Sequence, residues 1–74
     1  MNKGDRVWFV DLMFNKQCVE VPFAEYGILV EDKQNGYCIV KHYFGNFEIS
    51  KDALFETKED CEKFILGENK WNLL

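Results

Sequence analysis

The stretch ILVEDKQNGYCIV, residues 28–40, carries the clearest structural signal in this 74-residue chain. Apolar and β-branched residues flank the pair Asn35-Gly36, which is typical of a two-residue hairpin turn because both residues tolerate a positive φ. The stretch therefore predicts an antiparallel hairpin between strands at 24–32 and 37–44. Gly27, in the first of these strands, indicates a bulge or a sharp bend.

Further strands are expected on both sides of this hairpin. Residues 6–12 are rich in β-branched and aromatic side chains and predict a first strand. Residues 13–23 contain polar turn formers and a proline and predict a long, partly extended loop. Gly45-Asn46 predicts a second turn before a short strand at 47–49. One turn of 3₁₀ helix at 50–54 and a brief fifth strand at 55–56 complete the predicted β region.

The last third of the chain changes to a helical period. Thr57 is placed to cap a helix, and acidic residues follow in the first turn, where the helix dipole favours them. Cys61, Phe64 and Ile65 share one apolar face. Gly67 is placed as the residue after the C-cap. The pattern predicts a helix over 57–66 and a docked tail over 67–74, within a single domain spanning residues 1–74.

Two segments carry a resemblance to known proteins. The opening Gly4-Asp5-Arg6-Val7-Trp8, with the order of predicted elements, resembles small SH3-like barrels. The segment 52–64, DALFETKEDCEKF, is similar to the closing segment of short, mostly uncharacterised proteins of bacteria and their phages. The resemblance implies a mainly β fold: a small five-stranded SH3-like barrel, or meander, with a short C-terminal helix. Proline-rich peptide binding is not implied, because the paired-tyrosine motif of eukaryotic SH3 domains is absent.

Charge and cysteine content narrow the classes of function. Asp and Glu total 13 against 9 Lys and Arg, a net charge of −4, which argues against binding to nucleic acid or anionic membranes. The three cysteines are dispersed and odd in number, so reduced thiols that pack as small hydrophobes are expected. The sequence shows no signal peptide pattern and no long apolar stretch. We therefore expect a cytoplasmic protein, and the resemblance implies that the cell is a bacterial one.

The residue types needed for catalysis are sparse. His42 is the single histidine, and on a strand Cys38 lies roughly 13 Å from it, too far to share one zinc ion. Adjacent carboxylates point to opposite faces of a strand, and the five glycines are isolated, so no phosphate loop is indicated. These patterns predict a protein that is not an enzyme and that holds no metal and no cofactor.

The aromatic residues favour a binding role. The chain holds seven Phe, three Tyr and two Trp, more than a small core accommodates, so some are expected at the surface. We expect the tyrosines to anchor an interface and dispersed carboxylates to steer association. The predicted partner-binding residues are Tyr26, Tyr37, Tyr43, Glu31, Asp32 and Glu48.

The preferred hypothesis is a non-enzymatic protein-binding module that acts stoichiometrically on a larger partner with a basic surface. Its most specific form is a phage-type antagonist of a bacterial defence system, such as an anti-CRISPR-like inhibitor. A nucleotide-sequestering protein, with Arg6, Lys33 and Lys41 near the tyrosines, and an SH3-like accessory domain are the alternatives. The sequence does not decide whether the chain also associates with itself.

Overall fold

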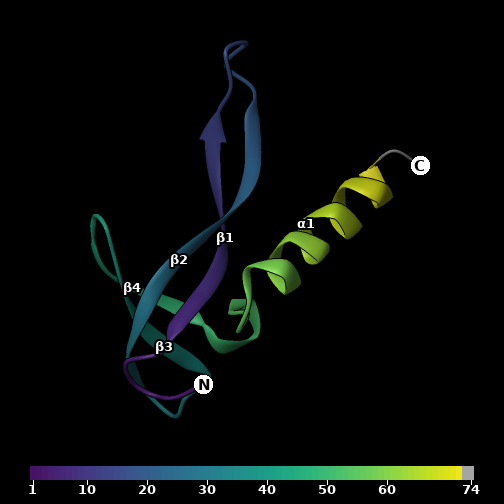
Figure 1. The fold of residues 1–74 in the computed structure, drawn as a ribbon. Helices are drawn as coiled ribbons and strands as arrows, with labels where there is room; N and C mark the ends of the chain where they lie inside the picture. The colour runs from purple at the N-terminus through teal and green to yellow at the C-terminus, as the bar shows by residue number, and fades with distance from the viewer. Residues whose placement is uncertain (73–74) are drawn as a thin grey trace.

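The computed structural model describes residues 1–72, and the side chains of residues 1–67. Four strands form one antiparallel sheet in the order β1 (Arg6–Phe14), β2 (Glu20–Asp32), β3 (Tyr37–His42) and β4 (Gly45–Ser50). A 3₁₀ turn (Lys51–Ala53) and the helix α1 (Lys58–Asn72) follow. The mainly β fold with a C-terminal helix agrees with the prediction. In the view of Figure 1, α1 and the β3–β4 hairpin lie on opposite sides of the β1–β2 ribbon.

The sheet is open, and the predicted fifth strand is reduced to one residue pair. Phe55 bridges Trp8 in β1, and each backbone N–H donates to the other residue's carbonyl at 2.8 Å. The ladder stops there because the chain turns away to begin α1 three residues later, at Lys58. Four strands and one bridge are present in the described part of the chain, so a five-stranded barrel is not shown.

The predicted loop over 13–23 is wrong. β1 and β2 pair in unbroken register as far as Phe14 and Glu20 and form a long hairpin that projects from the sheet (Figure 1). The Asn15 side-chain oxygen accepts hydrogen bonds from the N–H groups of Gln17 and Val19 and closes the turn. Pro22 is tolerated because β3 pairs with β2 only from Ile28 onward, so no further strand needs its missing N–H.

The hairpin between β2 and β3 is confirmed, but its turn differs from the prediction. Positive φ angles occur at Gln34 (59°) and Gly36 (90°), whereas Asn35 acts through its side chain, which accepts the N–H of Tyr37 at 3.1 Å. The register shift in β2 lies between Leu29 and Glu31 rather than at Gly27. This turn is therefore a wider loop built on side-chain hydrogen bonds.

The turn between β3 and β4 is also displaced. His42 pairs with Gly45, so the two turn residues are Tyr43 and Phe44, and the predicted turn at Gly45-Asn46 lies inside β4. Gly45 supplies a φ of 127°, which relieves the backbone directly after the turn. The shift places two aromatic side chains at the tip of a hairpin.

The core is small and lies against one face of the curved sheet. Its buried residues come from all parts of the sheet except β4 and from the segment after the 3₁₀ turn: Val7, Phe9, Leu29, Cys38, Val40 and Leu54. Cys61 and Ile65 are buried where α1 packs against β1 and β2. Cys38 and Cys61 are buried as predicted for packed cysteines, and burial raises the pKa of both thiols. Cys18 is exposed at the tip of the β1–β2 hairpin, so the prediction is wrong for this residue.

The start of α1 is confirmed and its predicted end is wrong. The Thr57 hydroxyl accepts the N–H of Asp60 at 3.1 Å, as an N-cap does. The helix continues through Gly67 to Asn72 instead of ending at residue 66, because Gly67 does not adopt the positive φ of a helix-ending glycine. Docking of the tail side chains lies outside the described residues. No helix in the described part of the chain is long and apolar enough to cross a membrane.

Candidate functional site

The outer part of the β1–β2 hairpin, residues 12–22, is an apolar arm. Leu12, Met13, Phe14 and Val19 are 51–67% exposed. Successive residues of a strand face opposite sides, so Leu12 and Phe14 lie on one face of the arm and Met13 on the other. On the N-terminal side of Ile28, β2 pairs with β1 alone, so the outer edge of each arm strand is unpaired. The arm thus offers two apolar faces and two free strand edges.

The tip of the β3–β4 hairpin carries the most exposed aromatic pair in the described structure. Tyr43 is 89% exposed and Phe44 80%, and their rings pack edge to face with centroids 5.0 Å apart. Turn positions normally hold Gly, Asn, Asp, Pro or Ser, which keep the chain soluble and flexible. Two aromatic rings at such a position bury little of their own surface. We call Tyr43-Phe44 the aromatic turn, and exposed rings of this kind are typical anchors of protein interfaces.

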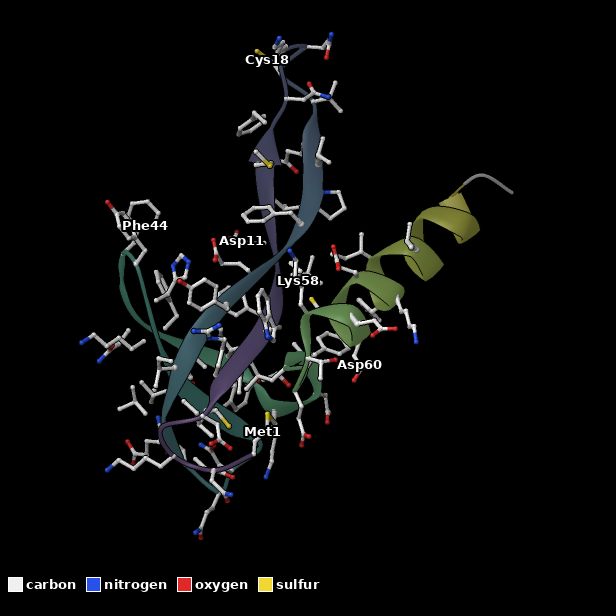
Figure 2. The ribbon with its side chains drawn as sticks, viewed as in Figure 1. Met1, Asp11, Cys18, Phe44, Lys58 and Asp60 are labelled. Carbon is white, nitrogen blue, oxygen red and sulfur yellow. The ribbon has the colours of Figure 1, made fainter. Side chains whose placement is uncertain are left out.

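An open groove of about 520 Å³ separates the base of the arm from the aromatic turn. Figure 2 shows Asp11 at the base of the arm, Phe44 across from it and Cys18 at the arm's tip. The lining of the groove is mixed. Its apolar residues include Leu12, Phe44 and Phe47, and its polar residues are Asp11, His42 and Glu48.

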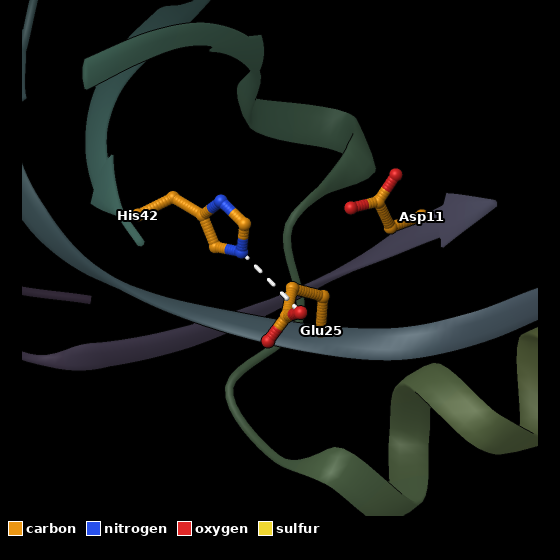
Figure 3. Close-up of side chains that lie close together, drawn as sticks. All are labelled: Asp11, Glu25 and His42. Atoms are coloured by element: carbon orange, nitrogen blue, oxygen red, sulfur yellow. Dashed lines mark ion pairs between the residues drawn. The ribbon is translucent and has the colours of Figure 1, made fainter. Parts of the chain in front are cut away.

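Three titratable side chains from three strands come together at the edge of this groove. Asp11 of β1 and His42 at the end of β3 line it, and Glu25 of β2 lies beside them. One ligand atom of each lies within 4.8 Å of the others. Figure 3 shows the imidazole and both carboxylates turned toward a common space. These are the side chains in the described structure whose types and spacing suit a metal ion.

His42 is held rigidly in this cluster. Its side chain is 7% exposed, and the rings of Phe9, Phe44 and Phe47 lie 5.5–5.9 Å from the imidazole. Its Nε2 lies 3.3 Å from Oε2 of Glu25. The aromatic surroundings therefore fix the imidazole with one ring nitrogen directed at the carboxylates.

The three predicted interface tyrosines do not form one surface. Tyr26 packs on Trp8 with centroids 5.4 Å apart and lies under the Arg6 guanidinium at 4.8 Å. Tyr37 is the first residue of β3 and Tyr43 follows its last residue, so the two lie roughly 20 Å apart along the strand. Among the three, only Tyr43 lies beside the groove.

Two of the three predicted carboxylates, Asp32 and Glu48, form ion pairs within the chain. The Asp32 carboxylate accepts a hydrogen bond from Lys51 at 2.9 Å, which holds the pKa of Asp32 below its ordinary value. Glu48 pairs with Lys33 at 2.7 Å, and this hydrogen bond raises the pKa of Lys33. Glu31 is exposed nearby. Asp32 and Glu48 are therefore each neutralised by a lysine rather than being part of a free acidic patch.

The basic set considered for nucleotide binding comes together only in part. Arg6 and Lys41 lie in one row across the sheet, because both pair with Ile28 of β2, and Arg6 stacks on Tyr26. Lys33 lies beyond the end of β2 and pairs with Glu48, so the three cations are not gathered around one tyrosine.

Sequence reasoning missed the arm and the cluster at its base. The run Leu12-Met13-Phe14, directly after the predicted first strand, was a signal for a longer strand. The cluster could not be found from spacing along the chain, because its three residues come together only through the register of two strand pairs. Comparisons with models of protein families, with curated proteins and with solved structures found no match to this chain.

Proposed function

We propose that this chain is a protein-binding module that contacts a larger partner through the apolar arm and the aromatic turn. The observation that carries the proposal is the arm itself, which is apolar on both faces and unpaired at both edges. A two-stranded ribbon gains little stability by itself in water, and it is stabilised when another surface covers it. Exposed strand edges also accept an added strand from a partner.

The aromatic turn supplies anchors of the kind that dominate binding energy. A buried aromatic side chain removes about 150–250 Å² from water, and truncation of a central anchor costs about 2 kcal/mol or more. Tyr43 and Phe44 are almost entirely free to be buried. The groove between the turn and the arm is wide enough to receive side chains of the partner.

The charge of the chain favours a different protein over a second copy. A net charge of −4 makes two copies repel each other, and it attracts a surface whose rim is basic. Binding of this kind is stoichiometric. The narrower hypothesis of a phage-type antagonist rests on the closing segment 52–64 alone and stays a prediction.

Site-specific photo-cross-linking in bacterial cells tests the proposal. A photoreactive phenylalanine analogue replaces Phe14 in the arm, Phe44 in the turn or, as a control, Leu66 on the exposed surface of α1. We expect the same protein to be captured from positions 14 and 44 and not from position 66. Capture of a second copy, capture from position 66 alone, or no capture from positions 14 and 44 contradicts the proposal.

A further inference from the structure

The cluster of Asp11, Glu25 and His42 has a feature that protein binding does not explain. Two carboxylates, Asp11 in the wall of the groove and Glu25 beside it, lie close together, and both are partly buried. Among the described side chains, no Lys or Arg forms an ion pair with either of them. Like charges at this spacing repel, and the repulsion grows as water is excluded. The arrangement therefore suits an additional cation.

We propose that Asp11, Glu25 and His42 bind a divalent transition-metal ion of the zinc type. The cluster offers one imidazole nitrogen and two carboxylate oxygens, which together are ligands of Zn²⁺ and its neighbours in the first transition row. The imidazole argues against Ca²⁺ and Mg²⁺, which take oxygen ligands. Three protein ligands with one open side is the pattern of an accessible zinc site, and here the open side faces the groove.

The geometry is close to what such an ion needs. Metal–ligand bonds of about 2.0–2.1 Å place neighbouring ligand atoms of a tetrahedral site about 3.3 Å apart. Nε2 of His42 and Oε2 of Glu25 already lie 3.3 Å apart. The Asp11 carboxylate lies within 4.8 Å of both, so a movement of about 1–2 Å would complete the ligand set.

The backbone helps to orient the two acidic ligands. The N–H of Leu12 donates to Oδ1 of Asp11 at 2.8 Å, and the N–H of Tyr26 donates to Oε1 of Glu25 at 2.9 Å. Each carboxylate therefore keeps one oxygen for the ion. Partners of this kind fix the orientation of metal ligands and strengthen binding.

The position of the site gives the ion a structural consequence. β3 pairs with β2 only from Ile28 onward. On the N-terminal side of Ile28, no backbone ladder joins β2 to β3. An ion held by Asp11, Glu25 and His42 joins β1, β2 and the end of β3 across this gap. Because the folded chain alone presents the three ligands together, the ion raises the melting temperature.

Titration of the purified chain with ZnCl₂, followed by calorimetry and by thermal melting, tests the proposal. The Cys18→Ser background removes the exposed thiol, which is a competing zinc ligand. We expect one Zn²⁺ per chain and a rise in melting temperature. Asp11→Asn, which keeps the side-chain shape, lowers the affinity at least about tenfold, since even loss of a ligand's hydrogen-bond partner costs about 10–100-fold.

Two further variants separate a metal site from general charge effects. Glu31→Gln removes the same charge at an exposed position and leaves the affinity unchanged. His42→Gln removes the nitrogen ligand, and Co²⁺ bound to the wild type gives visible absorption bands that this variant loses. No Zn²⁺ binding by the wild type, or equal binding by the wild type and Asp11→Asn, overturns the proposal. Neither result bears on the photo-cross-linking experiment, which involves no added metal.

Discussion

Gly27 in β2 lies directly against Val40 in β3. A Cβ built at position 27 comes within 2.5 Å of the Val40 Cγ1 and 2.7 Å of the backbone oxygen of Lys41. Val40 is fully buried in the core, so neither group has room to retreat. Glycine at position 27 therefore lets the backbone of β2 approach β3 closely at the point where the two strands begin to pair.

This contact predicts a large cost for a very small substitution. Gly27→Ala adds a single methyl group, and we expect it to lower the free energy of unfolding by about 1–3 kcal/mol, the usual cost of overpacking a core. Urea denaturation followed by circular dichroism measures the change. A stability equal to that of the wild type contradicts the close approach of the two strands.

The same substitution at Gly67 has the opposite predicted sign. Gly67 lies inside α1, and a Cβ there meets nothing within 4 Å. Alanine is favoured over glycine inside a helix by about 0.8–1.0 kcal/mol, so Gly67→Ala raises the free energy of unfolding by about that amount. If residue 67 instead ended the helix with a positive φ, the substitution would destabilise the protein. Urea denaturation distinguishes the two signs.

The cap of α1 predicts a third stability change. Thr57→Ala removes the hydroxyl that accepts the Asp60 N–H and lowers the free energy of unfolding by about 1 kcal/mol. Thr57→Ser keeps the hydroxyl and serves as the matched control. An equal loss from the alanine and serine variants shows that the hydrogen bond is not the cause.

The Asp32–Lys51 pair predicts a pH-dependent contribution to stability. The hydrogen bond from Lys51 places the folded pKa of Asp32 below the ordinary value of 3.8. The pair's contribution is therefore present above that value and is lost as the pH falls through the lowered pKa. In a carbon-13 carboxyl titration by NMR, Lys51→Gln raises the Asp32 pKa, whereas Lys3→Gln, with the same change of charge, does not. An unchanged pKa in Lys51→Gln contradicts the pairing.

Local sequence signals predicted the elements well where short-range chemistry decides them. The third strand, found at Tyr37–His42 where 37–44 was predicted, the capping threonine and the hairpin after Asp32 all follow from propensities and side-chain hydrogen bonds within a few residues. Turn positions were less predictable. Tyr43 and Phe44 lack the residue types that mark turns, so the turn was expected at the glycine that follows them.

The candidate site depended on pairing between distant strands, which no local pattern encodes. Asn15 and Pro22 suggested a loop over residues 13–23. Most of these residues in fact belong to paired strands and carry exposed hydrophobic side chains. Asp11, Glu25 and His42 come together because of the register of β1 on β2 and the close approach of β2 to β3 at Gly27. The predicted tyrosines were chosen by residue type alone, and only Tyr43 lies beside the groove.

The affinity of the cross-linked partner for variants of the arm and the turn tests the central claim most directly. The partner is purified and titrated by calorimetry with the wild type, Phe14→Ala, Tyr43→Ala/Phe44→Ala and the control Leu66→Ala. The proposal predicts a 1:1 complex that both the arm and the turn variants weaken by at least about 2 kcal/mol, roughly 30-fold, with the control unchanged. Affinities of the arm and turn variants equal to that of the wild type would contradict it.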